Sequence, residues 1–399
     1  MTATARKPGS DPGRVRLDRL PSLTGMRFFA ALAVFLYHLT IFQFSPFGGA
    51  FGARAGWLFG KSGWAGVSFF FVLSGFVLTW SARPGDGARP FIRRRLVKLF
   101  PSHLLTFGLA MALFASAYTT WREWLPNILL LHAWSPDYHV SFSVNIPSWS
   151  LSCELLFYVC FPVLLRLIKK IDAKHLWSWV IGLVALDFAV PVVAYATLPN
   201  APQAPGFPVG LTQNWLVYQF PPVRMIEFVV GMLMARIVLS DKWINVRILP
   251  ALALFAGAYT IGLNVPYLYS LAAVMLIPIA LLVAAVAVAD LRGTTSVLRG
   301  RVMTHLGDVS FAFYLTQAIV LMYGTRFLNP HKPYDIVAGL ALCLFEGVVV
   351  MALAQAIHAW VEMPMMRRFS RPRGSRGGSA GPRLRPVKSA TAVTGPLVL

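Results

Sequence analysis

The sequence predicts an all-α polytopic membrane protein with about ten transmembrane helices and both termini in the cytosol. Of its 399 residues, 57% are hydrophobic and only 13% are charged, whereas soluble domains carry roughly 25% charged residues. Apolar runs long enough to cross a bilayer recur along the chain. Lys and Arg concentrate in alternate loops, and this positive-inside bias predicts the orientation.

The apolar runs predict the position of each span. The expected spans are 23–42, 64–82, 100–118, 149–168, 176–197, 214–236, 248–265, 267–289, 303–325 and 336–360. The outer segment 119–148 holds an apolar stretch, 125–134, that is too short to cross and is predicted to be interfacial or re-entrant, in a position to roof a cavity. Segment 198–213 is rich in Pro and Gly and is predicted to be an outer loop.

The regions outside the spans complete the expected organisation. We expect a basic cytosolic segment at 1–20, a transmembrane domain at 21–365 and a basic disordered tail at 366–399. No cleavable signal and no soluble domain after the last helix are expected. The net charge of +21 is attributed to membrane orientation, not to nucleic-acid binding. The expected location is the cell (plasma) membrane, with the lipid bilayer as a partner.

The cysteines give no sign of special chemistry. Cys153, Cys160 and Cys343 all lie within predicted spans, where they are interpreted as small buried hydrophobic residues. Their spacing indicates neither a disulfide framework nor a metal site, and no metal is expected.

The first span carries two polar residues, Arg27 and His38, in an otherwise apolar helix. Eleven residues of α-helix bring them within about 20° of one face and separate them by roughly 16 Å along the axis. Ionisable groups inside a span are costly and usually mark a pathway or a site. Two other interpretations stay open: Arg27 could extend to the cytosolic headgroups, and His38 could make a structural hydrogen bond.

The fourth span begins with a second candidate, Glu154, about 7 Å below the expected outer surface. His38 is predicted at a similar depth, within about 10 Å of that surface. A histidine beside a carboxylate can accept a proton from a hydroxyl while the carboxylate orients the ring. The alternative is a structural ion pair between Glu154 and Arg224.

Further buried charges occur in later spans. Arg224 and Glu227 lie three residues apart in the sixth span, where they could form an architectural ion pair. Asp187 and Glu346, which are also deep, are interpreted as structural.

The second span and the loop after it contain two further patterns. Arg94, Arg95 and Lys98 belong to a basic run that could bind phosphate oxygens, although topology alone also demands cations there. Glycines and serines at 63–75 permit close helix packing, and Ser74 is the candidate for lining a substrate site.

Together these motifs resemble acyltransferase family 3, a family of integral membrane acyltransferases marked by an Arg and a His with ten residues between them in the first span. The resemblance rests on Arg27 and His38, on VSFFFVLSGF (67–76), on the basic run that ends at Pro101, and on WSLSCE (149–154), RMIEFVVG (224–231), LGDVSFAFYLTQ (306–317) and VEMP (361–364). It covers nearly the whole chain. Trp149, Ser310 and Tyr314 lie in these blocks and, like Ser74, Arg224 and Glu227, are expected to bind substrate or to be structural.

The resemblance implies transfer of an acyl group from cytosolic acyl-CoA, as acetyl-CoA or propionyl-CoA, to a hydroxyl. His38 matches the family's catalytic histidine and Arg27 its donor-associated arginine, and we expect the basic run to assist in donor binding. The roughly 16 Å between the two is of the order of an extended pantetheine arm. Gln317 stands where many relatives have His, and Lys98 replaces a common Arg, which leaves a point charge without bidentate geometry.

The acceptor expected first is a lipophilic secondary metabolite, because LPSLTGMRFFAALAVF resembles the branch that acylates macrolide antibiotics on a ring hydroxyl. A sugar of a surface or exported polysaccharide is the second choice. A proton-coupled transporter is a further alternative, since buried Arg, Glu, Asp and His also build transport pathways. The unbroken helix between Arg27 and His38 argues against it, because transporters often break helices at mid-membrane.

Overall fold

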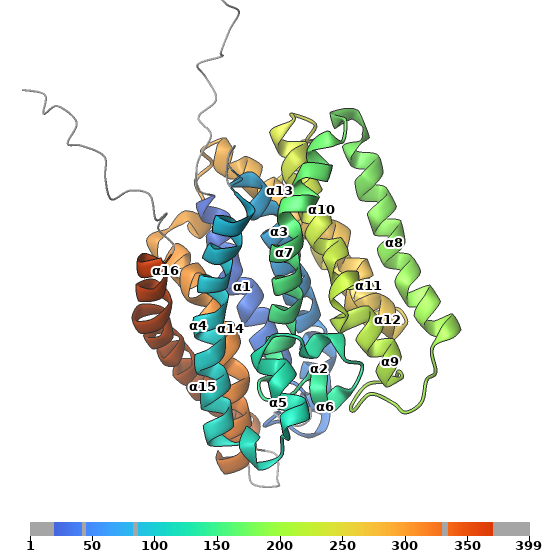
Figure 1. Cartoon of the computed structure of the whole chain (residues 1–399). Coiled ribbons are helices and arrows are strands. Elements are labelled where there is room, and N and C mark those ends of the chain that lie inside the picture. Colours follow the sequence, from blue (N-terminus) through green and yellow to red (C-terminus); the bar gives the residue numbers. More distant parts are fainter. Residues whose placement is uncertain (1–19, 42–44, 83–86, 329–333, 370–399) are drawn as a thin grey trace, which may run out of the picture.

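The protein is described by a computed structural model that covers residues 20–41, 45–82, 87–328 and 334–369. These residues form helices and contain no β-strand beyond two isolated bridges, which confirms the predicted all-α class for the described part of the chain. Figure 1 shows the helices gathered in one bundle. The predicted basic N-terminal segment and disordered tail lie almost entirely outside the described residues, so their boundaries stay predictions.

The helices follow the predicted spans closely. Their bounds are α1 Pro21–His38, α2 Gly49–Phe59, α3 Ser62–Trp80, α4 Ala88–Leu113, α5 Trp121–Ile128, α6 Tyr138–Ser141, α7 Trp149–Lys170, α8 Leu176–Thr197, α9 Leu211–Asn214, α10 Pro221–Leu239, α11 Ile248–Asn264, α12 Tyr267–Leu271, α13 Ala273–Leu291, α14 Arg301–Leu328, α15 Ile336–Ile357 and α16 Met363–Phe369. Eight of the predicted spans each overlap one long helix. The span predicted at 267–289 is instead divided between α12 and α13, and the one predicted at 214–236 covers the end of α9, the π-helical turn Trp215–Gln219 and most of α10.

Seven stretches of the described chain are long and apolar enough to cross a membrane. They are Gly49–Trp80, Ala88–Leu113, Ile146–Lys170, Ala173–Thr197, Tyr267–Leu291, Arg301–Gly324 and Ile336–Phe369. The apolar α11 is shorter, and α1 and α10, which carry the buried polar groups described below, are not among the seven. The chain is thus a polytopic membrane protein, while the count of about ten spans and the cytosolic location of the termini stay predictions.

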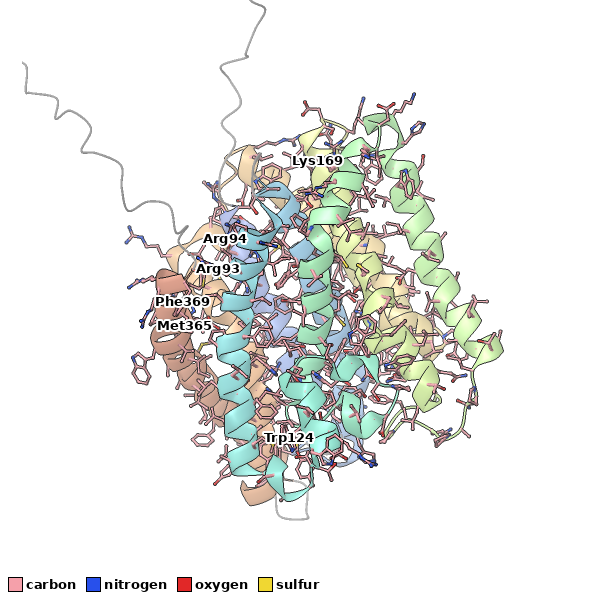
Figure 2. The ribbon with its side chains drawn as sticks, viewed as in Figure 1. Arg93, Arg94, Trp124, Lys169, Met365 and Phe369 are labelled. Carbon is pink, nitrogen blue, oxygen red and sulfur yellow. The ribbon has the colours of Figure 1, made fainter. Side chains whose placement is uncertain are left out.

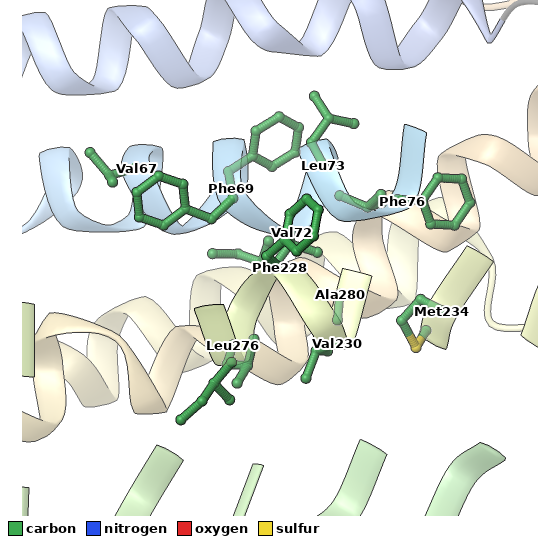
Figure 3. Close-up of a cluster of buried hydrophobic side chains, with 14 of the residues drawn as sticks. Val67, Phe69, Val72, Leu73, Phe76, Phe228, Val230, Met234, Leu276 and Ala280 are labelled. Carbon is green, nitrogen blue, oxygen red and sulfur yellow. The ribbon is translucent and has the colours of Figure 1, made fainter. Parts of the chain in front are cut away.

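The core is built on α3. This helix packs against α1 on one side and α10 on another, and α13 also contacts it. Figure 3 shows Phe69 and Phe76 of α3 in one buried apolar cluster with Phe228 of α10 and Leu276 of α13. α1 also packs along α14, so α1 lies between two long helices.

The two ends of the bundle differ in chemistry (Figure 2). Arg93 and Arg94 of α4 and Lys169 of α7 lie toward one end, which we call the basic end. Trp124 of α5 lies toward the opposite end. We call this the roofed end, because α5 and α6 cross it between α4 and α7.

The roof is held by a buried polar network. Asn127 Nδ2 donates to the Ser143 carbonyl oxygen at 2.7 Å and to Ser148 Oγ at 3.2 Å. Ser148 Oγ in turn lies 3.1 Å from Nε2 of His132, which is buried. The prediction that 125–134 does not cross the membrane is confirmed, because this stretch holds the end of α5 and one 3₁₀ turn.

Two glycines allow α3 and α10 to touch backbone to backbone. A Cβ added to Gly75 would collide with the Phe228 carbonyl oxygen, and one added to Gly231 would collide with the carbonyl oxygen of Val72. Small residues at such seams let helices in membranes pack closely. The structure therefore supports the packing interpretation of the glycine-rich second span.

We expect Gly75→Ala to destabilise the protein by about 1–3 kcal/mol, because the added methyl overpacks the α3–α10 seam. The measurement is the thermal midpoint of the purified protein in detergent. Gly257→Ala in α11 is the matched control, since a Cβ there meets no atom within 4 Å. Equal midpoints for the two variants would contradict the close seam.

Candidate active site

The first helix is anchored at the basic end by a carboxylate. Pro21 starts α1, and the Ser22 backbone N–H and Oγ donate to the two Asp290 carboxylate oxygens at 2.9 and 2.6 Å. A carboxylate at a helix N-terminus satisfies free backbone donors and complements the helix dipole. This anchor fixes the helix that carries both Arg27 and His38.

An inner cavity of about 120 Å³ lies toward the basic end. Three cationic side chains line it, Arg27 from α1 and Arg95 and Lys98 from α4. Glu154 of α7 lines it as well. The structure thus brings together four of the residues that the sequence singled out from three separate helices.

Electrostatic contacts tie this cluster together. Lys98 interacts with the like charges of Arg27 and Arg95 and with the carboxylates of Glu154 and Glu362. Cations gathered in a poorly solvated cavity repel one another unless carboxylates or a bound anion compensate them. Because Lys98 and the two arginines make three cations against these two carboxylates, the inner cavity is suited to an anionic ligand.

The Glu154 carboxylate has a neutral hydrogen-bond partner in the same cavity. Tyr158, one helical turn further along α7, donates its hydroxyl to Glu154 Oε2 at 2.6 Å. Tyr158 also hydrogen-bonds to the side chain of Ser74, which lines the cavity from α3. Ser74 thus lines the inner cavity, and its expected contact with a substrate stays a proposal.

An outer cavity of about 240 Å³ lies toward the roofed end and is lined by His38. Its other walls are largely aromatic, with Tyr37, Trp64, Trp149 and Tyr218 among them. Tyr138, Phe142, Ile146 and Pro147 of segment 119–148 line it too, which confirms that this segment roofs a cavity. No Asp, Glu, Lys or Arg occurs among the described residues that line it.

The structure does not bring Glu154 beside His38. Glu154 lines the inner cavity and His38 the outer one, whereas the side chain that hydrogen-bonds to His38 is that of Gln317. Gln317 is fully buried on α14, and its Nε2 donates to the Tyr314 carbonyl oxygen at 3.2 Å. The neutral carboxamide thus occupies the place expected for the carboxylate.

The depth of Glu154 explains this difference. The depth predicted for Glu154 assumes that α7 starts at the outer surface. In the structure, Trp149 at the start of α7 is buried and lies beneath the roof, on the outer cavity. Glu154, about 7 Å further along the helix, therefore reaches the inner cavity and the level of Lys98.

Arg224 and Glu227 form a buried ion pair on α10. Arg224 Nη2 lies 2.9 Å from Glu227 Oε2, and both side chains are 1% exposed. Arg224 Nη2 also donates to Ser68 Oγ at 3.2 Å, and the guanidinium lies over the rings of Phe71 and Tyr218. Neither Arg224 nor Glu227 lines either cavity, which supports a structural role for the pair. Arg224 is therefore paired with Glu227 and not with Glu154, the alternative partner considered from the sequence.

The remaining candidates occupy different positions. Arg94 is half-buried near the basic end and does not line the inner cavity. Ser310 is buried and donates to the Gly307 carbonyl oxygen within α14, which indicates a structural role. Asp187 and Glu346 are buried away from both cavities.

The cysteines differ slightly from expectation. All three are free thiols, but only Cys153 is fully buried, while Cys160 and Cys343 are half-buried. The described residues contain no cluster of His, Cys, Asp and Glu that could hold a metal ion.

Several neighbours of the site were not identified from the sequence. Tyr158 could have been found, because it follows Glu154 by four residues and so shares its helix face. Glu362 lies in the VEMP block, but only the fold brings its carboxylate to Ser102, at 3.1 Å, and near Lys98. Val67, which lines both cavities, had no polar signature to mark it.

Several known proteins are similar to this chain in sequence. The chain is 40% identical to acyltransferase MdmB of Streptomyces mycarofaciens, over 90% of this chain and 94% of that protein. It is 25% identical to the exopolysaccharide production protein ExoZ of Rhizobium meliloti (strain 1021), over 80% and 94% of the two chains. It is 26% identical to O-acetyltransferase OatA of Staphylococcus aureus (strain NCTC 8325 / PS 47), over 46% and 31%.

No solved structure is significantly similar to this chain. Residues 20–357 match the acyltransferase domain that defines acyltransferase family 3, which spans both cavities and the helices that line them. The chain therefore belongs to acyltransferase family 3 and is a membrane O-acyltransferase.

Proposed function

We propose that this enzyme transfers a short acyl group, acetyl or propionyl, from cytosolic acyl-CoA to a hydroxyl of a lipophilic secondary metabolite, most simply a macrolide. The observation that supports the proposal best is the pair of cavities stacked along the bundle. The inner one is lined by cations, and the outer one is aromatic and lined by His38. A polyanionic donor and a neutral lipophilic acceptor match these two linings.

In this proposal the donor occupies the inner cavity. Phosphate oxygens of CoA accept charge-assisted hydrogen bonds from Arg27, Arg95 and Lys98. Arg94 lies on the same helix near the basic end, where it adds to the field that attracts the phosphates. The roughly 16 Å between Arg27 and His38 then lets a pantetheine arm carry the thioester toward the outer cavity.

His38 acts as the general base. It takes the proton from the acceptor hydroxyl as the oxygen attacks the thioester carbonyl carbon. The carbon–sulfur bond breaks as the ester forms, and the imidazolium returns the proton to the leaving thiolate. Gln317 holds the imidazole in position during this exchange, because its carboxamide is itself fixed on the Tyr314 carbonyl oxygen.

The aromatic outer cavity supports a lipophilic acceptor. Tyr37, Trp64 and Trp149 offer a large apolar surface with hydroxyl and indole groups at its edges. The 40% identity to an acyltransferase of a Streptomyces species supports the same choice. The similarity to an exopolysaccharide production protein and to an O-acetyltransferase favours, as a second candidate, a sugar of a surface or exported polysaccharide. Membership of an acyltransferase family removes the reason to invoke a transporter.

The test is direct assay of transfer. Membranes that contain the protein would be incubated with acetyl-CoA or propionyl-CoA and a panel of macrolides and polysaccharide-derived sugars, and products would be read by mass spectrometry. An acylated macrolide supports the proposal. An acylated sugar with no macrolide product transfers the assignment to the second candidate, and absence of product with every acyl-CoA and acceptor would refute both.

Glu154 has a different role in this proposal from the one expected for a partner of His38: it compensates the cations of the donor site. We expect Glu154→Gln to lower the thermal midpoint, because Lys98 and its neighbouring arginines lose a carboxylate. Turnover per folded molecule should stay near the wild-type value. Added CoA should restore much of the lost midpoint, since its phosphates replace the missing negative charge. A stable variant with a much lower kcat would instead support the catalytic role.

A further inference from the structure

We propose that Val67 and Tyr314 determine the length of the acyl group that the enzyme transfers. The inference rests on the proposed function, in which the donor occupies the inner cavity and His38 acts from the outer one. Val67 and Tyr314 are the described residues that line both cavities. They therefore form the boundary that the thioester has to meet.

Each of four helices lines the inner cavity nearer the basic end and the outer cavity nearer the roofed end. α1 lines the inner cavity with Arg27 and the outer one with His38, and α7 lines the outer cavity with Trp149 and the inner one with Ser150. α3 and α14 change from one cavity to the other at Val67 and Tyr314. The two cavities are thus stacked end to end, and these two side chains lie at the junction.

The Tyr314 ring is held in place at this junction. Its hydroxyl lies 2.8 Å from Ser150 Oγ and donates to the Pro147 carbonyl oxygen at 3.1 Å. Its ring also packs edge to face with Phe70, with ring centroids 5.9 Å apart. A buried phenol with these partners presents a wall of fixed shape.

Val67 forms the other side of the junction and is 3% exposed. It belongs to α3, the helix that the glycine seam holds against α10. Its branched side chain has few rotamers, so the space beside it is well defined. The room for an acyl chain at the junction thus depends on the volume of this side chain.

The space at the junction selects acyl groups by length, because of where the reaction has to take place. With the phosphates among the inner cations, the carbonyl carbon has to lie near the junction for His38 to activate its attack. An acetyl or propionyl group then fits between Val67 and Tyr314. A longer chain would extend into the outer cavity and occupy space that the acceptor needs.

The test uses unreactive donor analogues, so it requires no acceptor. Binding of S-ethyl-, S-butyl- and S-hexyl-CoA thioethers to the purified full-length protein would be measured by calorimetry in detergent. For Val67→Ala we expect S-hexyl-CoA to gain about tenfold in affinity relative to S-ethyl-CoA, because one or two methylenes of space change discrimination by that order. For Val67→Ile we expect the opposite change.

Val163→Ala is the matched control, since Val163 is 56% exposed on α7 and lines neither cavity. The thermal midpoint of every variant is measured beside its length profile, which separates a change of space from misfolding. An identical length profile in Val67→Ala, Val67→Ile and the wild type would overturn the inference. If these proteins still bound CoA, the proposed donor site would remain supported. Failure of the wild-type protein to bind CoA would overturn both.

Discussion

We expect His38→Ala to lower the kcat of acyl transfer by about 10²–10⁴-fold in the assay that detects the wild-type product. The reason is that His38 is the histidine that lines the outer cavity among the described residues, so no neighbouring imidazole can take its place. Donor binding should be nearly unchanged, because the cationic cluster lies in the other cavity. The measurement combines steady-state turnover with calorimetric binding of CoA.

The control for this result is His139→Ala, which removes an exposed imidazole from α6. His132 is a poor substitute base, because burial lowers its pKa to about 3 and its ring is bound to Ser148 in the roof. If His38→Ala kept wild-type turnover at an unchanged thermal midpoint, His38 would be a structural residue and the proposed mechanism would be wrong.

We expect Arg27→Ala to raise the apparent KM for acyl-CoA by about 10- to 100-fold, the effect of losing one charge-assisted hydrogen bond to phosphate. The KM for the acceptor should change little, because Arg27 does not line the outer cavity. Initial rates at varied acyl-CoA and at varied acceptor would give the two constants separately.

Lys169→Ala is the charge-matched control for Arg27→Ala. It removes one cation from the same end of the bundle, but Lys169 is exposed at the end of α7 and lies outside the inner cavity. An equal effect of the two changes would indicate that general positive charge, and not a specific contact, attracts the donor. An unchanged donor KM in Arg27→Ala would leave Arg27 as a residue of membrane topology.

The positions of the long helices could be predicted because hydrophobic length and charge bias act locally along the chain. Each predicted span overlaps helical structure, and the short apolar stretch 125–134 belongs to the roof and does not cross, as expected. The Arg224–Glu227 pair could be predicted in the same way, since a spacing of three residues on one helix places the two side chains together. These features need no knowledge of how the helices pack.

The partner of His38 could not be predicted in this way. The sequence places Glu154 beside His38 only by its depth in the membrane. That depth is measured from the start of α7, which in the structure lies beneath the roof and not at the outer surface. Gln317 was noticed only as a departure from a family pattern, because its proximity to His38 depends on the packing of α1 along α14. The junction at Val67 and Tyr314 depends on packing in the same way, since it exists only where four helices meet.

The glycine seam between α3 and α10 has a mechanical consequence. No side chain separates the two backbones at Gly75 and Gly231, so α3 and α10 cannot slide or tilt against each other without a collision. We therefore expect the two helices to behave as one rigid unit. Val67 belongs to this rigid unit and forms the fixed side of the junction between the two cavities. Any change in the width of the junction therefore has to come from the opposite side, and there it would first have to break the hydrogen bonds that hold the Tyr314 hydroxyl to Ser150 and Pro147.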